Sequence, residues 1–229
     1  MVAKESPAVH RMGRSFRGLS GWPPFTGPGR LAILPCMTIR KIARMGHPIL
    51  RRPAAPIADP TDPKIQALIA DMIETMEDAN GAGLAAPQVY ESVRLVVFQA
   101  PAARATAEID AEESFDHTAP LTVLINPEIT PLSADLELGW EGCLSVPGLR
   151  GLVPRYREIA YRGLNAAGEM IERRAKGFHA RVVQHECDHL DGILYPQRMT
   201  DMRGLIFETE VRHWMERAPS GEQVAQTLL

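Results

Sequence analysis

One stretch of sequence decides the fold of this chain: Gln184-His185-Glu186-Cys187-Asp188-His189-Leu190-Asp191-Gly192. Two histidines four residues apart, with a glutamate directly after the first, fit one face of an α-helix because successive helical residues are rotated by about 100°. His185, Glu186 and His189 then lie within a third of a turn of one another, whereas Cys187 points roughly the opposite way. The predicted helix therefore offers two imidazole ligands for a metal ion and one carboxylate for acid/base chemistry.

A catalytic metal site needs more than these two imidazoles, because it usually has a third protein ligand and keeps one position open for water. The best candidate is Cys143, in the block Glu141-Gly142-Cys143-Leu144-Ser145, where the glycine and the serine suit a turn that presents a thiolate. Further upstream, Gly81-Ala82-Gly83-Leu84-Ala85-Ala86-Pro87-Gln88 has small residues that allow close backbone approach, and it ends in an amide donor.

The three blocks, in this order, resemble those of the peptide deformylases, metallohydrolases that remove the formyl group from the N-termini of new polypeptides. The family pattern reads G-x-G-L-A-A-P-Q, then E-G-C-L-S, then Q-H-E-x-D-H-L-x-G, and the chain matches every specified position. A single HExxH motif is a weak signal, but three complete matches in order are a strong one. The resemblance runs from about Met37 to about Thr200. It implies an α+β fold in which antiparallel sheets surround a central metal-binding HExxH helix.

The resemblance also implies a role for each matching residue. The expected metal ligands are Cys143, His185 and His189. Glu186 is the expected acid/base, which takes a proton from the attacking water and passes it to the departing amine. The side chain of Gln88 and the backbone N–H of Leu144 match the pair of groups that donate to the developing oxyanion.

Substrate binding is expected from two further groups of residues. Those that hold the substrate backbone in extended form are Gly81, Gly83, Glu141 and Gly142. Phe178 and Val182, which share a helix face with His185, are expected to help form the pocket for the methionine side chain. Arg150 and Arg155 match arginines that follow the cysteine block in many family members, and they are expected to support the site; salt-bridged surface positions are the alternative.

The implied cofactor is iron(II), which zinc, nickel or cobalt can replace. The ligands alone do not decide which metal is bound, because one thiolate and two imidazoles suit several first-row ions.

The implied partners are nascent formyl-methionyl polypeptides at the ribosome exit, and the chain is expected to be a monomer or a weak dimer. A net charge of −3 gives no argument for nucleic acid or an acidic membrane surface as the main partner, and the chain has no apolar run of the roughly 18 residues that span a bilayer. The odd number of cysteines, three, favours a reducing cytoplasm over a disulfide framework.

The chain is expected to have three parts. Residues 1–36 contain five lysines or arginines but a single acid, Glu5, and they lack the apolar pattern of a folded segment. They are interpreted as a disordered or non-native extension, with an organelle transit peptide as the minority alternative. Residues 37–200 form the predicted catalytic domain, and residues 201–229 form a C-terminal helix, over 201–217, and a tail.

Other elements follow from local patterns. Asp62-Pro63 caps a predicted helix whose apolar positions recur every three or four residues up to Met76. Residues 95–98 and 121–125 read as strands, the second ending at Asn126-Pro127, and residues 155–164 and 169–175 read as a hairpin. The acidic, alanine-rich stretch 99–120 between the two strands is interpreted as a mobile insertion.

Three rival interpretations remain at this point. A zincin-type endopeptidase shares HExxH but normally takes histidine or glutamate as its third ligand. A purely structural Cys-His-His site needs a fourth ligand and has no use for Glu186 beside the histidines. A non-enzymatic, metal-stabilised binding module would be expected to have lost parts of the motifs, and no loss is visible.

Overall fold

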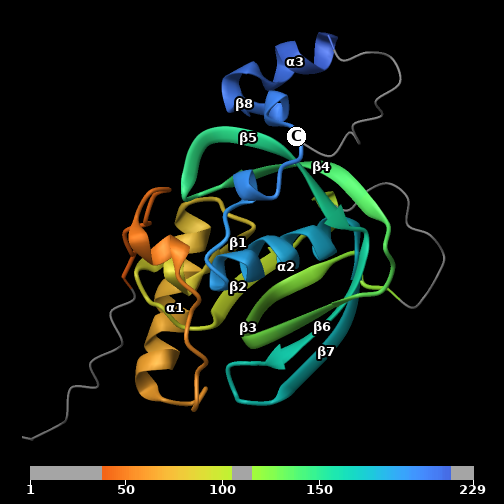
Figure 1. The fold of residues 1–229 in the computed structure, drawn as a ribbon. Helices are drawn as coiled ribbons and strands as arrows, with labels where there is room; N and C mark the ends of the chain where they lie inside the picture. Colours follow the sequence, from red (N-terminus) through yellow and green to blue (C-terminus); the bar gives the residue numbers. More distant parts are fainter. Residues whose placement is uncertain (1–37, 105–114, 218–229) are drawn as a thin grey trace, which may run out of the picture. The chain divides into compact units, whose positions relative to one another are not determined.

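The computed structural model describes residues 38–104 and 115–217, which form two antiparallel sheets and three α-helices (Figure 1). The five-stranded sheet has the order β1-β2-β3-β6-β7, and the three-stranded sheet has the order β4-β5-β8. The strands are β1 (Gly83–Ala85), β2 (Leu95–Ala100), β3 (Ala119–Pro131), β4 (Leu136–Cys143), β5 (Val146–Tyr156), β6 (Glu158–Leu164), β7 (Met170–Lys176) and β8 (Leu205–Phe207). The α-helices are α1 (Pro63–Asp78), α2 (Gly177–Leu190) and α3 (Val211–Arg217). Short 3₁₀ helices span Pro48–Arg51, Ala86–Val89, Ala102–Arg104, Tyr195–Gln197, Met202–Gly204 and Glu208–Glu210.

The α+β fold with antiparallel sheets around the HExxH helix is confirmed, and the β2 sequence shows how the layers form. Its apolar residues alternate between the two faces of the sheet, because successive strand residues point to opposite sides. Val96 and Phe98 pack against α2, whereas Leu95 and Val97 pack against α1. The sheet therefore lies between the two helices, and the first four residues of β2, Leu95 to Phe98, are all apolar because both faces of the strand are buried there.

Helix α1 begins and ends as its sequence predicts. The Asp62 carboxylate accepts a hydrogen bond from the backbone N–H of Lys64 at 2.7 Å, and Pro63 occupies the first turn, where its missing N–H costs nothing. The buried face includes Leu68, Ile69, Met72 and Met76. Asn80, in the left-handed region with φ 53°, then turns the chain into the Gly81 block.

The long strand β3 corrects one prediction. Asn126-Pro127 does not end the strand, which continues to Pro131 after a shift in its pairing with β6 between Ile125 and Glu128. Asn126 adopts φ 51°, and its side-chain amide accepts from Ile57 N at 2.9 Å and donates to Ile57 O at 2.8 Å. The asparagine therefore forms a bulge that ties the N-terminal segment to the sheet.

The predicted insertion over 99–120 is too wide. Gln99 and Ala100 belong to β2, and Ala119 and Pro120 belong to β3. Asp116 pairs with the backbone of β7, donating to Arg174 O at 2.8 Å and accepting from Lys176 N at 3.3 Å. Residues 105–114 lie outside the described part of the chain.

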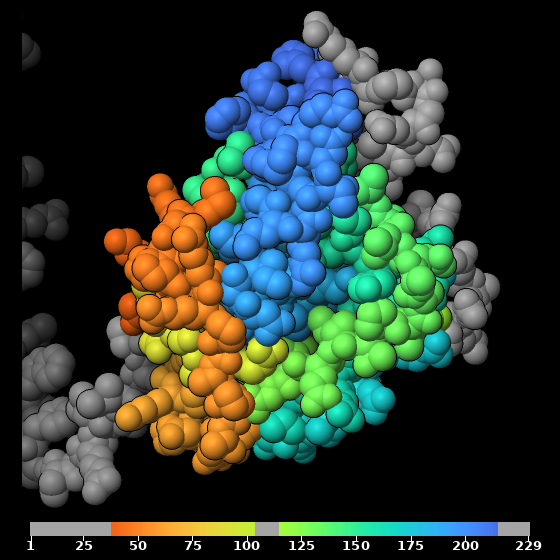
Figure 2. Space-filling view, in the orientation of Figure 1, coloured from red at the N-terminus to blue at the C-terminus, as the bar shows by residue number. Residues whose placement is uncertain are grey.

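The predicted C-terminal helix over 201–217 is wrong in its first half. Residues 205–207 form β8, which pairs with Leu149, Arg150 and Gly151 of β5, and α3 begins only at Val211. The backbone pairing with β5 stabilises a strand here, although the local sequence pattern favours a helix. Tertiary contacts often override local helix propensity in this way. The segment after α2, blue in Figure 2, runs along the surface and joins the sheet that carries Cys143, so the described part of 201–229 is not separate from the catalytic domain.

The hairpin prediction is confirmed, with β6 beginning at Glu158 rather than at Arg155, which belongs to β5. In the turn, Gly168 has φ 80°, and the Asn165 side chain accepts from the N–H groups of Ala167 and Glu169 at 2.9 Å each. Among the described residues, no helix has the length and apolar character that crossing a membrane requires.

A buried histidine links α2 to Asp116, shortly before β3, and to β6. His179 is fully buried, with Nδ1 at 2.8 Å from the Asp116 carbonyl and Nε2 at 3.0 Å from the Tyr161 hydroxyl. The carbonyl can only accept, so Nδ1 donates, and in the neutral ring Nε2 accepts from the tyrosine. Burial lowers the pKa of His179 to about 4, because the charged ring would lose its hydration.

This histidine should make the protein less stable in acid. The unfolded chain, with a histidine pKa near 6.5, binds more protons than the folded one between about pH 6.5 and pH 4, so stability rises with pH in that window. The contribution of neutral His179, on the order of 3 kcal/mol, is fully present above that window and is lost as the pH falls to 4. Denaturant unfolding of the wild type and of His179→Gln at several pH values measures it. The advantage of the wild type should shrink toward pH 4, and parallel stability curves for the two proteins would contradict the prediction.

Candidate active site

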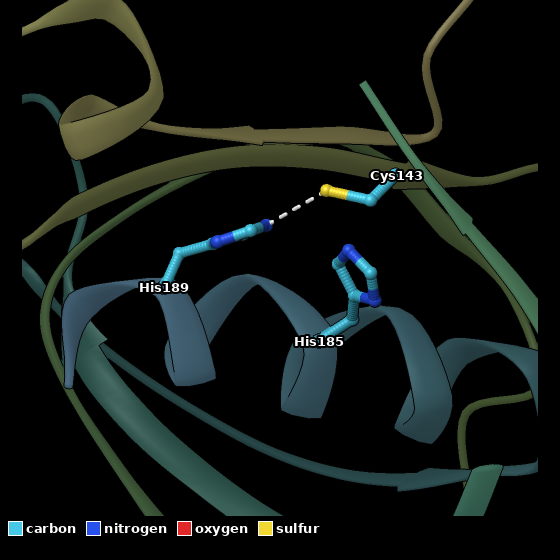
Figure 3. Close-up of side chains that lie close together, drawn as sticks. All are labelled: Cys143, His185 and His189. Atoms are coloured by element: carbon cyan, nitrogen blue, oxygen red, sulfur yellow. Dashed lines mark hydrogen bonds between the residues drawn. The ribbon is translucent and has the colours of Figure 1, made fainter. Parts of the chain in front are cut away.

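The three expected metal ligands converge in space. Cys143 lies at the end of β4, His185 and His189 lie on the face of α2 below it, and their ligand atoms are all within 4.8 Å of one another (Figure 3). The Cys143 Sγ is 3.3 Å from His189 Nε2. Both histidines are buried, and Cys143 is half-buried. Among the described residues, no other cluster of three histidine, cysteine or acidic side chains has this geometry.

Cys187 lies away from this cluster, as the helix geometry predicts. Its side chain is buried in the core between α2 and the five-stranded sheet, together with Phe98 and Leu190. Burial raises the pKa of the Cys187 thiol, which disfavours the thiolate that a metal would need.

Glu141 fixes the orientation of His185. Its Oε2 accepts a hydrogen bond from His185 Nδ1 at 2.8 Å, which leaves Nε2 of the ring as the nitrogen available to a metal. Arg155 donates to both carboxylate oxygens, at 2.8 and 3.0 Å, and Arg181 donates to Oε1 at 3.1 Å. Burial alone would raise the pKa of Glu141, but the charge of Arg155 and the hydrogen bond from His185 outweigh it and lower the pKa. The carboxylate is therefore fully engaged, and only the backbone of Glu141 remains for a substrate.

The network continues beyond Glu141. Arg155 also donates to Asp188 at 2.5 Å, and Asp188 accepts from Arg198 at 2.7 and 3.1 Å. Arg155 and Asp188 are both buried, so the expectation that Arg155 supports the site agrees with its position. Arg150, in contrast, forms a partly exposed ion pair with Glu208.

Sequence reasoning missed Arg181. It stands one helical turn before His185, on the same face of α2, and besides Glu141 it donates to the backbone oxygens of Glu137 and Val153 at 2.8 Å each. A charged residue on the buried, ligand-bearing face of a helix was the signal that could have found it, because such a charge needs partners.

Glu186 occupies the position expected of an acid/base. It is buried beside the metal-ligand cluster, and its Oε2 has no hydrogen-bond partner within the described part of the chain. Burial raises the pKa of Glu186 to about 7, because the carboxylate loses hydration that no nearby donor replaces. A carboxyl group with a pKa near neutrality can both accept and release a proton at physiological pH.

The amide of Gln88 also points into the site. Its Oε1 accepts from the backbone N–H of Ala85 at 2.8 Å, which orients Nε2 toward Ser145 Oγ at 3.1 Å and Cys143 Sγ at 3.6 Å. Leu144, the other expected oxyanion residue, follows Cys143 directly and lines the same cleft.

This cleft has a volume of about 410 Å³ and runs between β1, the β4–β5 turn and α2. Its lining contains every residue expected to bind substrate: Gly81, Gly83, Glu141, Gly142, Phe178 and Val182. The lining also includes Arg150, which was expected to support the site, and residues that the sequence did not place in a cleft, among them Trp140, Arg181 and Glu208.

Position 83 has room only for glycine, because the Glu186 side chain lies directly beside it in this cleft. A Cβ atom added there would collide with the carboxylate of Glu186, whereas a Cβ added at Gly142 would meet nothing closer than Arg150 Cγ at 3.9 Å. Neither glycine has a positive φ, so the difference between the two positions is one of space and not of backbone strain.

Gly83→Ala is therefore expected to displace Glu186 and to lower kcat by at least about tenfold, since overpacking of this kind typically costs about 1–3 kcal/mol. Gly142→Ala should cause a clearly smaller loss. Steady-state kinetics and melting temperatures of both variants test this. Equal losses in both variants, or a loss in Gly83→Ala that follows global unfolding, would show that the contact with Glu186 is not the cause.

Comparison with known proteins agrees with this geometry. The family model of polypeptide deformylase matches residues 39–204. Peptide deformylase 1 of Nitrosomonas europaea is 51% identical over 165 residues, which are 72% of this chain and 90% of that protein. Peptide deformylase 2 of Bordetella bronchiseptica is 56% identical over 164 residues, 72% of this chain and 89% of that protein.

Solved structures of peptide deformylases are also similar to this chain. The crystal structure of peptide deformylase from Ehrlichia chaffeensis has a TM-score of 0.67 at 31% identity and covers 72% of this chain and 90% of its own. The Met-Ala-Ser-bound class I type b peptide deformylase from Acinetobacter baumannii has a TM-score of 0.62 at 39% identity and covers 71% of this chain and 99% of its own. The zincin-type interpretation is thereby rejected. The chain belongs to the peptide deformylase family, enzymes that remove the N-terminal formyl group from nascent polypeptides.

Proposed function

We propose that Cys143, His185 and His189 hold one divalent metal ion, natively iron(II), and that Glu186 moves the proton in hydrolysis of formyl-methionyl peptides. The observation that carries this proposal is the convergence of three ligand atoms within 4.8 Å beside a buried carboxylate. One thiolate and two imidazoles suit iron(II), zinc, nickel and cobalt, and three protein ligands leave a position open for chemistry.

A divalent ion in this site would supply Lewis acidity, which polarises the formyl oxygen and brings the pKa of water toward neutrality. The protein supplies the remaining functions. Glu186 accepts the proton of the attacking water and returns it to the amine nitrogen as the C–N bond breaks. The Gln88 amide and the Leu144 N–H donate to the oxygen on which negative charge develops. Glu141 keeps His185 in the tautomer whose Nε2 can bind metal.

The substrate is held as an added strand. β1 is an edge strand of the five-stranded sheet, so the backbone between Gly81 and Gly83 can pair with an extended peptide, as in other cases of strand addition. Gly142 lines the opposite side, and Phe178 and Val182 line the pocket for the methionine side chain. The small residues on both sides let the peptide backbone approach closely.

Nascent chains emerging from bacterial-type ribosomes in the cytoplasm are the proposed physiological substrates, and the protein is proposed to act as a monomer or weak dimer. The bacterial sources of the relatives support this proposal. The extension over residues 1–36 is proposed to be dispensable for catalysis.

The identity of the metal can be tested directly. Protein purified anaerobically from its native source is expected to contain close to one iron per chain, and the apoprotein reloaded with Fe²⁺ should turn over at least as fast as protein loaded with Zn²⁺, Ni²⁺ or Co²⁺. Full occupancy by zinc in the anaerobic preparation, with turnover that iron does not match, would contradict the assignment of iron.

A further inference from the structure

The C-terminal segment forms part of the rim of the substrate cleft. β8 pairs with β5, so that Arg150 lies opposite Ile206, and Glu208 follows two residues later. Arg150 donates from Nε and Nη2 to the same oxygen of Glu208, at 3.0 and 2.6 Å. Both residues line the cleft. A residue outside the expected catalytic domain therefore contributes to the site.

The charged residues that line the cleft form two groups. Glu141, Arg181, His185 and Glu186 are buried or nearly so and lie at the metal-binding end. Arg150 and Glu208 have side chains that are 26% and 55% exposed. Among the described residues that line this cleft, Arg150 and Glu208 are thus the exposed charged groups. A bound peptide that extends from the metal-binding end toward solvent would pass close to them.

The position of Arg150 relates this pair to the substrate. In the β4–β5 pairing, Arg150 stands opposite Gly142, and a Cβ added at Gly142 would lie 3.9 Å from Arg150 Cγ. Gly142 directly precedes the ligand Cys143, so a peptide whose formyl group lies among the ligands and whose backbone follows Gly142 passes the Arg150 side chain. Because an extended chain advances about 3.3 Å per residue, the guanidinium lies within reach of the first few residues after the formylated one.

We propose that Glu208 is a specificity-determining residue, which neutralises Arg150 at the rim and so makes the enzyme indifferent to the charge of the residues that follow formyl-methionine. This inference rests on the proposed function of the cleft. Exposed ion pairs contribute little to stability, so the pair is not needed to hold the fold. An enzyme that acts on many nascent chains has to accept acidic and basic residues alike, and a neutral rim permits this. Removing Glu208 leaves the guanidinium charge available to an acidic substrate.

The test uses the full-length, metal-loaded protein and three C-terminally amidated peptides, formyl-Met-Ala-Asp, formyl-Met-Ala-Asn and formyl-Met-Ala-Lys. The ratio of kcat/KM for the Asp peptide to that for the Lys peptide should be near one in the wild type. Glu208→Gln should raise this ratio by about two- to fivefold, the size expected for one exposed charge interaction, mainly through KM. The increase should disappear at high salt.

Two further variants test whether a change in the kcat/KM ratio comes from the Arg150–Glu208 pair. Glu210→Gln removes a similarly exposed charge two residues further on, whose carboxylate contacts Thr209 rather than Arg150, and it should leave the ratio at the wild-type value. The double variant Arg150→Met/Glu208→Gln should return the ratio to near one. If Glu208→Gln and Glu210→Gln give the same ratio, the proposal is overturned while activity on the Asn peptide still supports the deformylase assignment. Absence of formate release from the Asn peptide by the wild type would contradict both.

Discussion

Replacing Glu186 by glutamine is expected to lower kcat by at least about 10²-fold while the metal stays bound, because a positioned acid/base typically contributes about 10²- to 10⁴-fold. Glutamine has nearly the same volume and hydrogen-bonding reach as glutamate, but it cannot accept the proton of the attacking water. The ligand atoms of Cys143, His185 and His189 are untouched by the change. Gln88 and Leu144 also keep their positions, so KM should change much less than kcat.

The measurement is metal content and steady-state kinetics on the same preparation of Glu186→Gln. Retained turnover would show that Glu186 is not the proton carrier. Loss of metal in proportion to the loss of activity would show instead that the carboxylate supports metal binding, which would contradict its role as a proton carrier.

The second large effect concerns the two described cysteines. Cys143→Ser should weaken metal binding by at least about 100-fold, because it removes a thiolate from the ligand set and even the loss of an outer-shell partner costs about 10- to 100-fold. Cys187→Ser should keep the metal. Its expected cost is stability, about 1–3 kcal/mol, because a hydroxyl would enter the apolar core between α2 and the five-stranded sheet.

Metal titration of both apoproteins and denaturant unfolding of both holoproteins separate these outcomes. Equal loss of metal affinity in the two variants would reject the assignment of Cys143 as ligand and Cys187 as a core residue. A Cys143→Ser protein that binds metal like the wild type would contradict the three-ligand site itself.

The residues of the site that could be predicted were those set by local geometry or by matched motifs. The period of an α-helix places His185, Glu186 and His189 on one face and Cys187 on another, whatever the rest of the chain does. Helix α1 was equally predictable, since its cap at Asp62 and its apolar face are local. Cys143 required more than periodicity, because nothing in the helix specifies which distant residue completes the ligand set.

The contacts within the network around Glu141 could not be predicted, because its members are distant in sequence. Glu141 lies 14 residues from Arg155, 40 from Arg181 and 44 from His185, and these contacts exist only once β4, β5 and α2 have packed together. The motif indicates that the segment of Glu141 holds the substrate backbone, but it does not indicate that the Glu141 carboxylate also accepts a hydrogen bond from His185. The role of a buried carboxylate can be inferred only when the groups that bind to it are known.

Strand β8 was not predicted from the sequence, for a related reason. Leu205 and Ile206 fit the apolar face of a helix as well as a short strand, since three residues are too few for a period to show. Their pairing with Gly151 and Arg150 decides the outcome. The same pairing brings Glu208 to the rim of the cleft, which a helix over 201–217 gave no reason to expect.

We propose that the deformylase activity of this chain depends on one metal ion held by Cys143, His185 and His189. The most direct measurement is release of formate from formyl-Met-Ala-Ser by purified protein of known metal content. Formate release should rise in proportion to bound metal up to one ion per chain, disappear on chelation, and return when Fe²⁺ is added. Turnover by metal-free protein, or a fully metal-loaded protein that releases no formate, would contradict the account.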